Sequence, residues 1–125
     1  MSDFVSFKLA KKLKEKGFSL EKTEIYGKFD SDGLFHSQLY FNYFETMDCD
    51  EIIAPTISQV SKWLRKEFSL HISQKPYPCE DGLMWMYEIR KFNKRIVFVI
   101  ANKTGFVEEE EASLAGIEYI IDNLI

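Results

Sequence analysis

The segment LMWMYEIRKFNKRIVFVIA, residues 83 to 101, carries the strongest β-strand signal of the chain. Apolar, aromatic and β-branched residues fill it on both sides of a short polar break, which is typical of two antiparallel strands joined by a tight turn. We expect Asn93 and Lys94 to form that turn, which would pair Lys91 with Ile96. One face of the hairpin is then apolar and needs helices to cover it. Its residues are Trp85, Tyr87, Ile89, Ile96, Phe98 and Ile100.

Two amphipathic helices are predicted on either side of these strands. In residues 56 to 68, Thr56 and Gln59 match a capping box, in which each side chain bonds to the backbone N–H at the other position. In residues 108 to 125, four glutamates stand in the first turn, where carboxylates complement the positive end of the helix dipole. A further strand is expected between the first helix and the hairpin. Residues 54 to 125 thus have the order α-β-β-β-α.

The first fifty residues are expected to form a helix and a β-hairpin. Apolar residues recur at helical spacing from Ser6 to Lys16, with lysines on the opposite face. A polar turn, Asp30-Ser31-Asp32-Gly33, then separates two aromatic-rich strands, roughly residues 24 to 29 and 34 to 42. The stretch before Pro55 is predicted to be a linker, because the residue before a proline is disfavoured in a helix.

The predicted fold class is α+β. An N-terminal helix and β-hairpin, residues 1 to 50, pack beside an α-β-β-β-α unit, residues 54 to 125, whose helices lie on one face of an antiparallel sheet. The chain has 125 residues, of which 46% are hydrophobic, so it can bury a core of its own. We expect one compact domain.

Two resemblances follow from this order and from particular segments. The α-β-β-β-α order is similar to that of the double-stranded RNA-binding domain; such domains present lysines at the start of their second helix, where this chain has four glutamates that would repel phosphates. The segments VSFKLAKKLKEKGF (5 to 18), IIAPTISQVSKWLRKEFSLHI (52 to 72) and EEEEASLAGIEYIIDNLI (108 to 125) resemble, in that order, uncharacterised small proteins of phages and prophages of gut bacteria. That resemblance implies an α+β fold and a phage-associated origin, and it implies no activity.

Charge and composition exclude several classes of protein. The net charge of −4 argues against a general binder of nucleic acids or anionic membranes. No run of about 18 apolar residues is present, so we expect a cytoplasmic protein without contact to a membrane. Two cysteines are too few for a disulfide framework and are expected to be reduced.

The scarce chemistry-bearing residues are His36, Cys49, His71 and Cys79. Their spacing forms no C-x-x-C or H-x-x-x-H pair, so neither a metal site nor a cofactor is expected. No phosphate loop and no nucleophile signature surrounds either cysteine, and no catalytic residue is assigned. A small enzyme with a Cys/His site is therefore the third hypothesis, and catalysis is not expected.

The favoured hypothesis is a non-catalytic, phage-associated accessory protein that binds another protein. The aromatic hairpin supplies its candidate contact residues, Tyr40, Tyr43 and Phe44, and the acidic end of the last helix is a second candidate surface. The alternative is a nucleic-acid-binding module that uses basic helix faces. Those faces carry Lys8, Lys11, Lys12, Lys62, Arg65 and Lys66.

Overall fold

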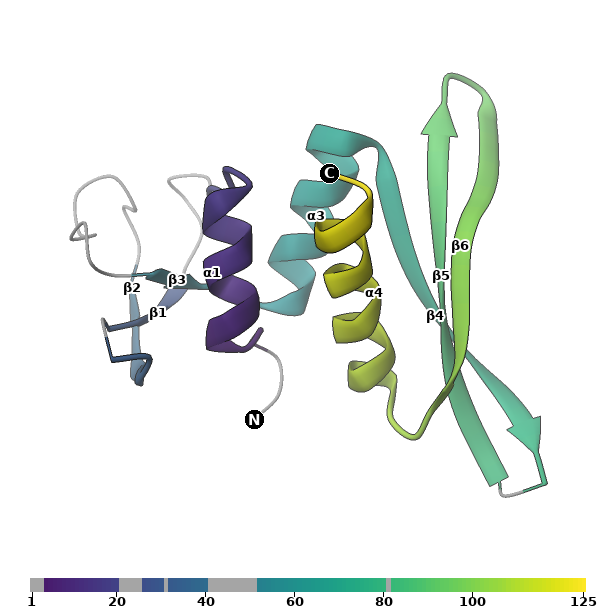
Figure 1. Ribbon diagram of the computed structural model, residues 1–125, viewed down its shortest axis with the longest axis horizontal. Coiled ribbons are helices and arrows are strands. Elements are labelled where there is room, and N and C mark those ends of the chain that lie inside the picture. Colours follow the sequence, from purple (N-terminus) through teal and green to yellow (C-terminus); the bar gives the residue numbers. More distant parts are fainter. Residues whose placement is uncertain (1–3, 21–25, 31, 41–51, 81) are drawn as a thin grey trace. The chain divides into compact units, whose positions relative to one another are not determined.

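The computed structural model describes residues 4–20, 26–30, 32–40, 52–80 and 82–125, without the side chains of residues 26 and 36–40. Contacts divide the chain into an N-terminal unit, Met1–Gln59, and a C-terminal unit, Val60–Ile125. The boundary between the two units lies inside helix α3 (Ile57–Phe68). Helices and antiparallel strands occur together, which confirms the α+β class (Figure 1). A single domain stays a prediction.

Helix α1 (Phe7–Glu15) opens the described part of the N-terminal unit and matches the helix predicted from Ser6. The Ser6 hydroxyl accepts a hydrogen bond from the backbone N–H of Leu9 at 3.2 Å, which caps the helix start. Leu9, Ala10 and Leu13 are buried and form its apolar face.

The sheet of this unit has the order β2-β1-β3, with antiparallel neighbours. Strands β1 (Tyr26–Phe29) and β2 (Phe35–Tyr40) form the predicted hairpin. Its turn is fixed by Asp30, whose Oδ1 accepts hydrogen bonds from the backbone N–H groups of Asp32 at 2.9 Å and Leu34 at 3.0 Å.

The predicted linker before Pro55 was wrong, because β3 (Ile52–Ala54) pairs with β1 there. Three residues are too few to show the alternation by which a strand is recognised in a sequence. The extended conformation of these residues is determined instead by the pairing of β3 with β1 and by its contact with α1. Ile53 and Ala54 are buried as a result.

Helix α3 begins with the predicted capping box. The backbone N–H of Gln59 donates to Thr56 Oγ1 at 3.1 Å, and the backbone N–H of Thr56 donates to Gln59 Oε1 at 3.0 Å. Ser69, with a φ of 56°, ends the helix in the left-handed region and turns the chain into the next strand.

Three long strands form the sheet of the C-terminal unit in the order β4 (Leu70–Cys79), β5 (Gly82–Asn93) and β6 (Ile96–Phe106). Helix α4 (Glu109–Asn123) covers one face of this sheet (Figure 1). The side chains buried between them include Leu70, Ile72, Tyr87, Ile89, Ile117 and Ile120. Strands β4 and β6 form the two edges of the sheet, and among the described residues each of them pairs only with β5.

The predicted turn of the β5–β6 hairpin was wrong by one residue. Lys94 and Arg95 form it, so Asn93 pairs with Ile96, and Lys91 pairs with Phe98 instead of Ile96. Lys94 takes a φ of 56°, the left-handed conformation that such two-residue turns require. The hairpin tip extends past the end of α4 (Figure 1), so part of the expected apolar face lies outside the core.

In the described part of the chain, no helix combines the length and the apolar character needed to cross a lipid bilayer.

Candidate functional site

Strand β6 exposes four consecutive apolar side chains, and we call residues 96–99 the exposed edge. The exposed fractions are 63% for Ile96, 51% for Val97, 43% for Phe98 and 44% for Val99. Single exposed apolar residues are ordinary on a protein surface, whereas a contiguous group marks an interaction site. Since β6 is also an edge strand, its outer backbone groups have no neighbouring strand among the described residues.

The four residues of the exposed edge are divided between the two faces of the sheet. Paired residues point to the same face, so Val99 shares its face with Arg90, which is opposite to the face covered by α4. Phe98 points to the α4 side, where it pairs with Lys91. Phe98 is exposed although it points to the α4 side, and Val99 is exposed on the face that α4 does not cover.

Two irregularities limit the length of regular β6 backbone. The pairing with β5 shifts at Ile100, which has no partner between Val99 and Ala101, and again at Gly105. Gly105 has a φ of 99°, and its N–H donates to Tyr77 Oη at 2.8 Å. Bulges protect a sheet edge against further pairing, so regular pairing along the exposed edge is confined to the four residues between the turn and the bulge at Ile100.

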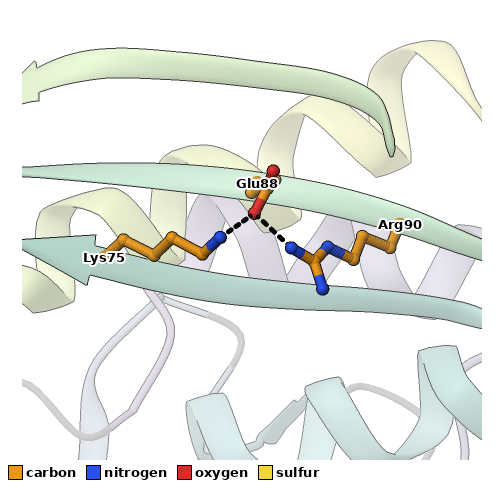
Figure 2. Close-up of polar contacts among 3 residues, drawn as sticks. All are labelled: Lys75, Glu88 and Arg90. Atoms are coloured by element: carbon orange, nitrogen blue, oxygen red, sulfur yellow. Dashed lines mark hydrogen bonds and ion pairs between the residues drawn. The ribbon is translucent and has the colours of Figure 1, made fainter. Parts of the chain in front are cut away.

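The sheet face opposite α4 carries a polar cluster. His71 pairs with Arg90 and Ser73 pairs with Glu88, so these side chains lie side by side. Glu88 Oε2 accepts from Lys75 Nζ at 2.7 Å and from a terminal guanidinium nitrogen of Arg90 at 3.0 Å (Figure 2). The hydrogen bond from Lys75 lowers the pKa of Glu88, against the opposing effect of burial, and the charge of Arg90 lowers it further.

His71 is held in its neutral form at neutral pH. Burial lowers the pKa of its imidazole, and the positive charges of Arg65 and Arg90 lower it further. The ring lies 6.2 Å from that of Phe92, centroid to centroid. With a neutral imidazole, the positive charges of Arg65, Arg90 and Lys75 outnumber the single carboxylate of Glu88 in and around the cluster.

Several atoms of this cluster lack a partner. His71 Nδ1, Ser73 Oγ and Arg90 Nε are buried and form no hydrogen bond within the described structure. Buried polar atoms usually have a partner, and leaving one unsatisfied costs about 1–3 kcal/mol. The three atoms stand on neighbouring residues of β4 and β5, on the same face as Val99.

The hairpin around the exposed edge is basic. No aspartate or glutamate occurs from residue 89 to residue 107. That stretch contains five cationic residues: Arg90, Lys91, Lys94, Arg95 and Lys103. An apolar strip bordered by positive charge favours partners that combine apolar and acidic groups.

The structure separates His71 from Cys79. They stand at opposite ends of β4, about 27 Å apart at roughly 3.4 Å per residue of extended strand. Cys79 is an exposed free thiol whose Sγ donates to the carbonyl of Gly82 at 3.2 Å. The side chain of His36 and all of Cys49 lie outside the described residues. Within the described residues, no three His, Cys, Asp or Glu side chains form a group that could hold a metal ion.

The aromatic residues predicted to bind a partner fall mostly beyond what the structure describes. Tyr40 ends β2, where its backbone pairs with Tyr26, and Tyr43 and Phe44 are outside the described residues. The acidic first turn of α4 is present as predicted, with Glu109, Glu110 and Glu111.

The basic residues of the nucleic-acid hypothesis belong to two different units. Lys8, Lys11 and Lys12 are on α1, where Lys11 Nζ lies 5.4 Å from the centre of the Phe7 ring. Lys62, Arg65 and Lys66 are exposed residues of α3 within the C-terminal unit. Among them, Arg65 acts electrostatically on His71.

The exposed edge was missed in the sequence, where Ile96 and Phe98 were expected in the core. One signal was available, since Ile-Val-Phe-Val-Ile, residues 96 to 100, has no polar residue. Successive side chains of a strand alternate between faces, so an uninterrupted apolar run must place some of them on the side away from a single helix layer.

Comparisons of the chain with protein-family models, with curated proteins and with solved structures gave no match.

Proposed function

We propose that this protein acts by non-catalytic binding to another protein, and that the exposed edge is its contact surface. The observation that carries the proposal is the run of four exposed apolar residues, 96–99, on an edge strand. Such a strand offers backbone donors and acceptors for strand addition, and its side chains supply apolar contacts on both faces. The proposed contact surface is therefore the β5–β6 hairpin instead of the aromatic hairpin that was expected from the sequence.

The proposal also includes a phage-associated origin and a cytoplasmic location. The resemblance of three long segments to phage and prophage proteins supports a phage-associated accessory protein, and the absence of a long apolar run in the sequence supports a cytoplasmic one.

A substitution in the exposed edge tests the proposal. Tagged protein is incubated with nuclease-treated extract of the organism that encodes it, and captured proteins are compared between wild type and Val97→Lys. We expect a captured protein that Val97→Lys loses by at least about tenfold, because the contact would have to bury a charged side chain in place of an apolar one.

The matched control is Val107→Lys, which introduces the same charge. Val107 is 65% exposed and lies just beyond β6, outside the exposed edge. Val107→Lys should capture the same amount of the partner protein as wild type. Equal capture by wild type and Val97→Lys, or equal loss in both variants, would contradict the proposal.

Nucleic-acid binding is the second candidate function. It is favoured by the electrostatic proximity of Arg65 and Arg90 to His71, which gathers positive charge from α3 and β5 in one unit. Contacts to phosphate release counterions, so affinity for a nucleic acid would fall steeply between 50 and 200 mM salt, by roughly 10³-fold for about six contacts. Recovery of nucleic acid in the untreated extract, with loss of every protein after nuclease treatment, would support this candidate over the first.

A further inference from the structure

The exposed edge has room for a short partner strand. Its regular backbone runs from the turn at Arg95 to the bulge at Ile100, so about four residues can pair with it. A partner of that length gains little from backbone hydrogen bonds alone, and its side chains must supply the specificity.

The positive charges of the hairpin determine which side chains a partner strand can carry. The hairpin presents Lys94 and Arg95 at its turn and Arg90 beside Val99, and no carboxylate occurs between residues 89 and 107. Carboxylates on a partner strand would meet these cations, whereas lysine or arginine there would be repelled.

Arg90 supports the same chemistry. Its side chain is 37% exposed, and it stands on the strand that pairs with β6, directly beside Val99 and on the same face. A carboxylate oxygen is an acceptor only and therefore suits a guanidinium donor.

A second copy of the chain fits the exposed edge less well. Antiparallel pairing of two copies about residues 96–99 would place Lys94 and Arg95 of each copy opposite residues 101 and 100 of the other, two residues from Lys103. Like charges brought this near to each other oppose the pairing.

We infer that the exposed edge binds an extended acidic segment of another protein, which adds as a strand beside residues 96–99 and presents carboxylates to Arg90, Lys94 and Arg95. The inference rests on the proposed function and adds the chemical class of the partner.

Two synthetic peptides test it. The acidic probe is Asp-Glu-Val-Thr-Val-Thr-Val-Glu-Asp with blocked ends, and the matched probe replaces every acidic residue by lysine. Each is titrated into the full-length, isotope-labelled protein at 50 mM salt while amide NMR signals are followed. We expect the acidic probe to shift the amides of residues 96–99 and the lysine probe to bind at least about tenfold more weakly.

Two charge-reversal variants test which cations of the hairpin contact the acidic probe. Arg95→Glu at the turn should lower the affinity of the protein for the acidic probe by about fivefold, which is the upper range for one exposed ion pair. Lys103→Glu makes the same change beyond the bulge at Ile100 and should weaken it by less than about twofold.

Three results of the peptide titrations would overturn the inference. They are equal binding of the two probes, shifts that map outside the exposed edge, and no binding of either probe at millimolar concentration. If a protein captured from extract is still lost in Val97→Lys, the proposed function stands while the acidic chemistry is wrong. A dimer in sedimentation velocity that Val97→Lys abolishes would instead assign the edge to a second copy and would also overturn the inference.

Discussion

Gly116 of α4 packs so closely on Ile72 of β4 that a Cβ atom at position 116 would lie 3.1 Å from Ile72 Cγ2. The same Cβ would lie 3.3 Å from the Tyr87 ring, so both strands under the helix restrict this position. The close approach fixes the distance between helix and sheet and thereby the burial of Ile117 and Ile120.

Gly116→Val is expected to destabilise the protein, because its side chain needs space that Ile72 and Tyr87 occupy. Overpacking of this kind costs about 1–3 kcal/mol. The control Ala115→Val makes a similar change at the neighbouring, partly exposed position and should cost about 0.5 kcal/mol through helix propensity alone. Urea unfolding of the two variants measures the difference, and equal losses would show that the contact is not restrictive.

Thr56→Ala should remove one half of the capping box of α3. The backbone N–H of Gln59 would lose its acceptor, and we expect a loss of ~1 kcal/mol in the free energy of unfolding. Ser58→Ala, at an exposed position in the same turn, should change it by less than about 0.5 kcal/mol. Thermal denaturation of both variants checks this, and a larger effect of the serine substitution would contradict the assignment.

The pKa of His71 should rise when Arg65 is replaced by glutamine, since the charge of Arg65 lowers it. Lys66→Gln removes a charge one residue further along and should have a smaller effect. The pH dependence of the histidine ring signals in NMR spectra measures both. A pKa of His71 that is the same in Arg65→Gln and wild type would refute the electrostatic contact.

The lowered pKa of His71 also has a consequence for stability. The unfolded chain binds the proton near the usual value of 6.5, and the folded chain binds it only at lower pH. Acidification below pH 6.5 therefore favours the unfolded state until the folded pKa is passed, and stability falls in that window. In His71→Gln this part of the pH dependence should be absent from urea unfolding curves.

Glu88→Gln should weaken the polar cluster at neutral pH. Its carboxylate is 12% exposed and bonds to Lys75 and Arg90, which are themselves far more exposed, so we expect a loss of only ~0.5–1 kcal/mol. The pKa of Glu88 is lowered from 4.5, so its contribution is present above that value and is lost as pH falls through the folded pKa.

The difference between Glu88→Gln and wild type should accordingly vanish in strong acid. Glu67→Gln, at an exposed position of α3, serves as the control and should leave the free energy of unfolding within about 0.5 kcal/mol at neutral pH. A difference at Glu88 that persists unchanged in acid would rule out the ion pairs as its cause.

The parts of the fold that were predicted correctly depend on neighbours in the sequence. The capping box joins Thr56 and Gln59, three residues apart, and the turn at Asp30 is closed by bonds to Asp32 and Leu34. Helix dipoles and side-chain caps act over one turn, so the residues that specify them are adjacent in the chain.

The polar cluster could not have been predicted in the same way. His71 and Arg90 are neighbours only because β4 and β5 pair in one particular register. A shift by one residue would send His71 to the face covered by α4. The sequence singled out His71 only as one of four scarce chemistry-bearing residues, and the pairing of β4 with β5 placed it beside Arg90, where the charge of Arg65 also acts on it.

The sequence by itself determined the helices, the capping box of α3, the polar turn of the first hairpin and the α+β class. The tertiary structure alone decided the three-residue strand β3, the register of β5 with β6, and which apolar side chains are covered. Ile89 is fully buried and Ile96 is exposed, although both belong to the same apolar pattern. The physical reason is that local hydrogen bonds specify a helix or a turn, whereas burial depends on how far α4 reaches along the sheet, which is a property of the whole packed unit.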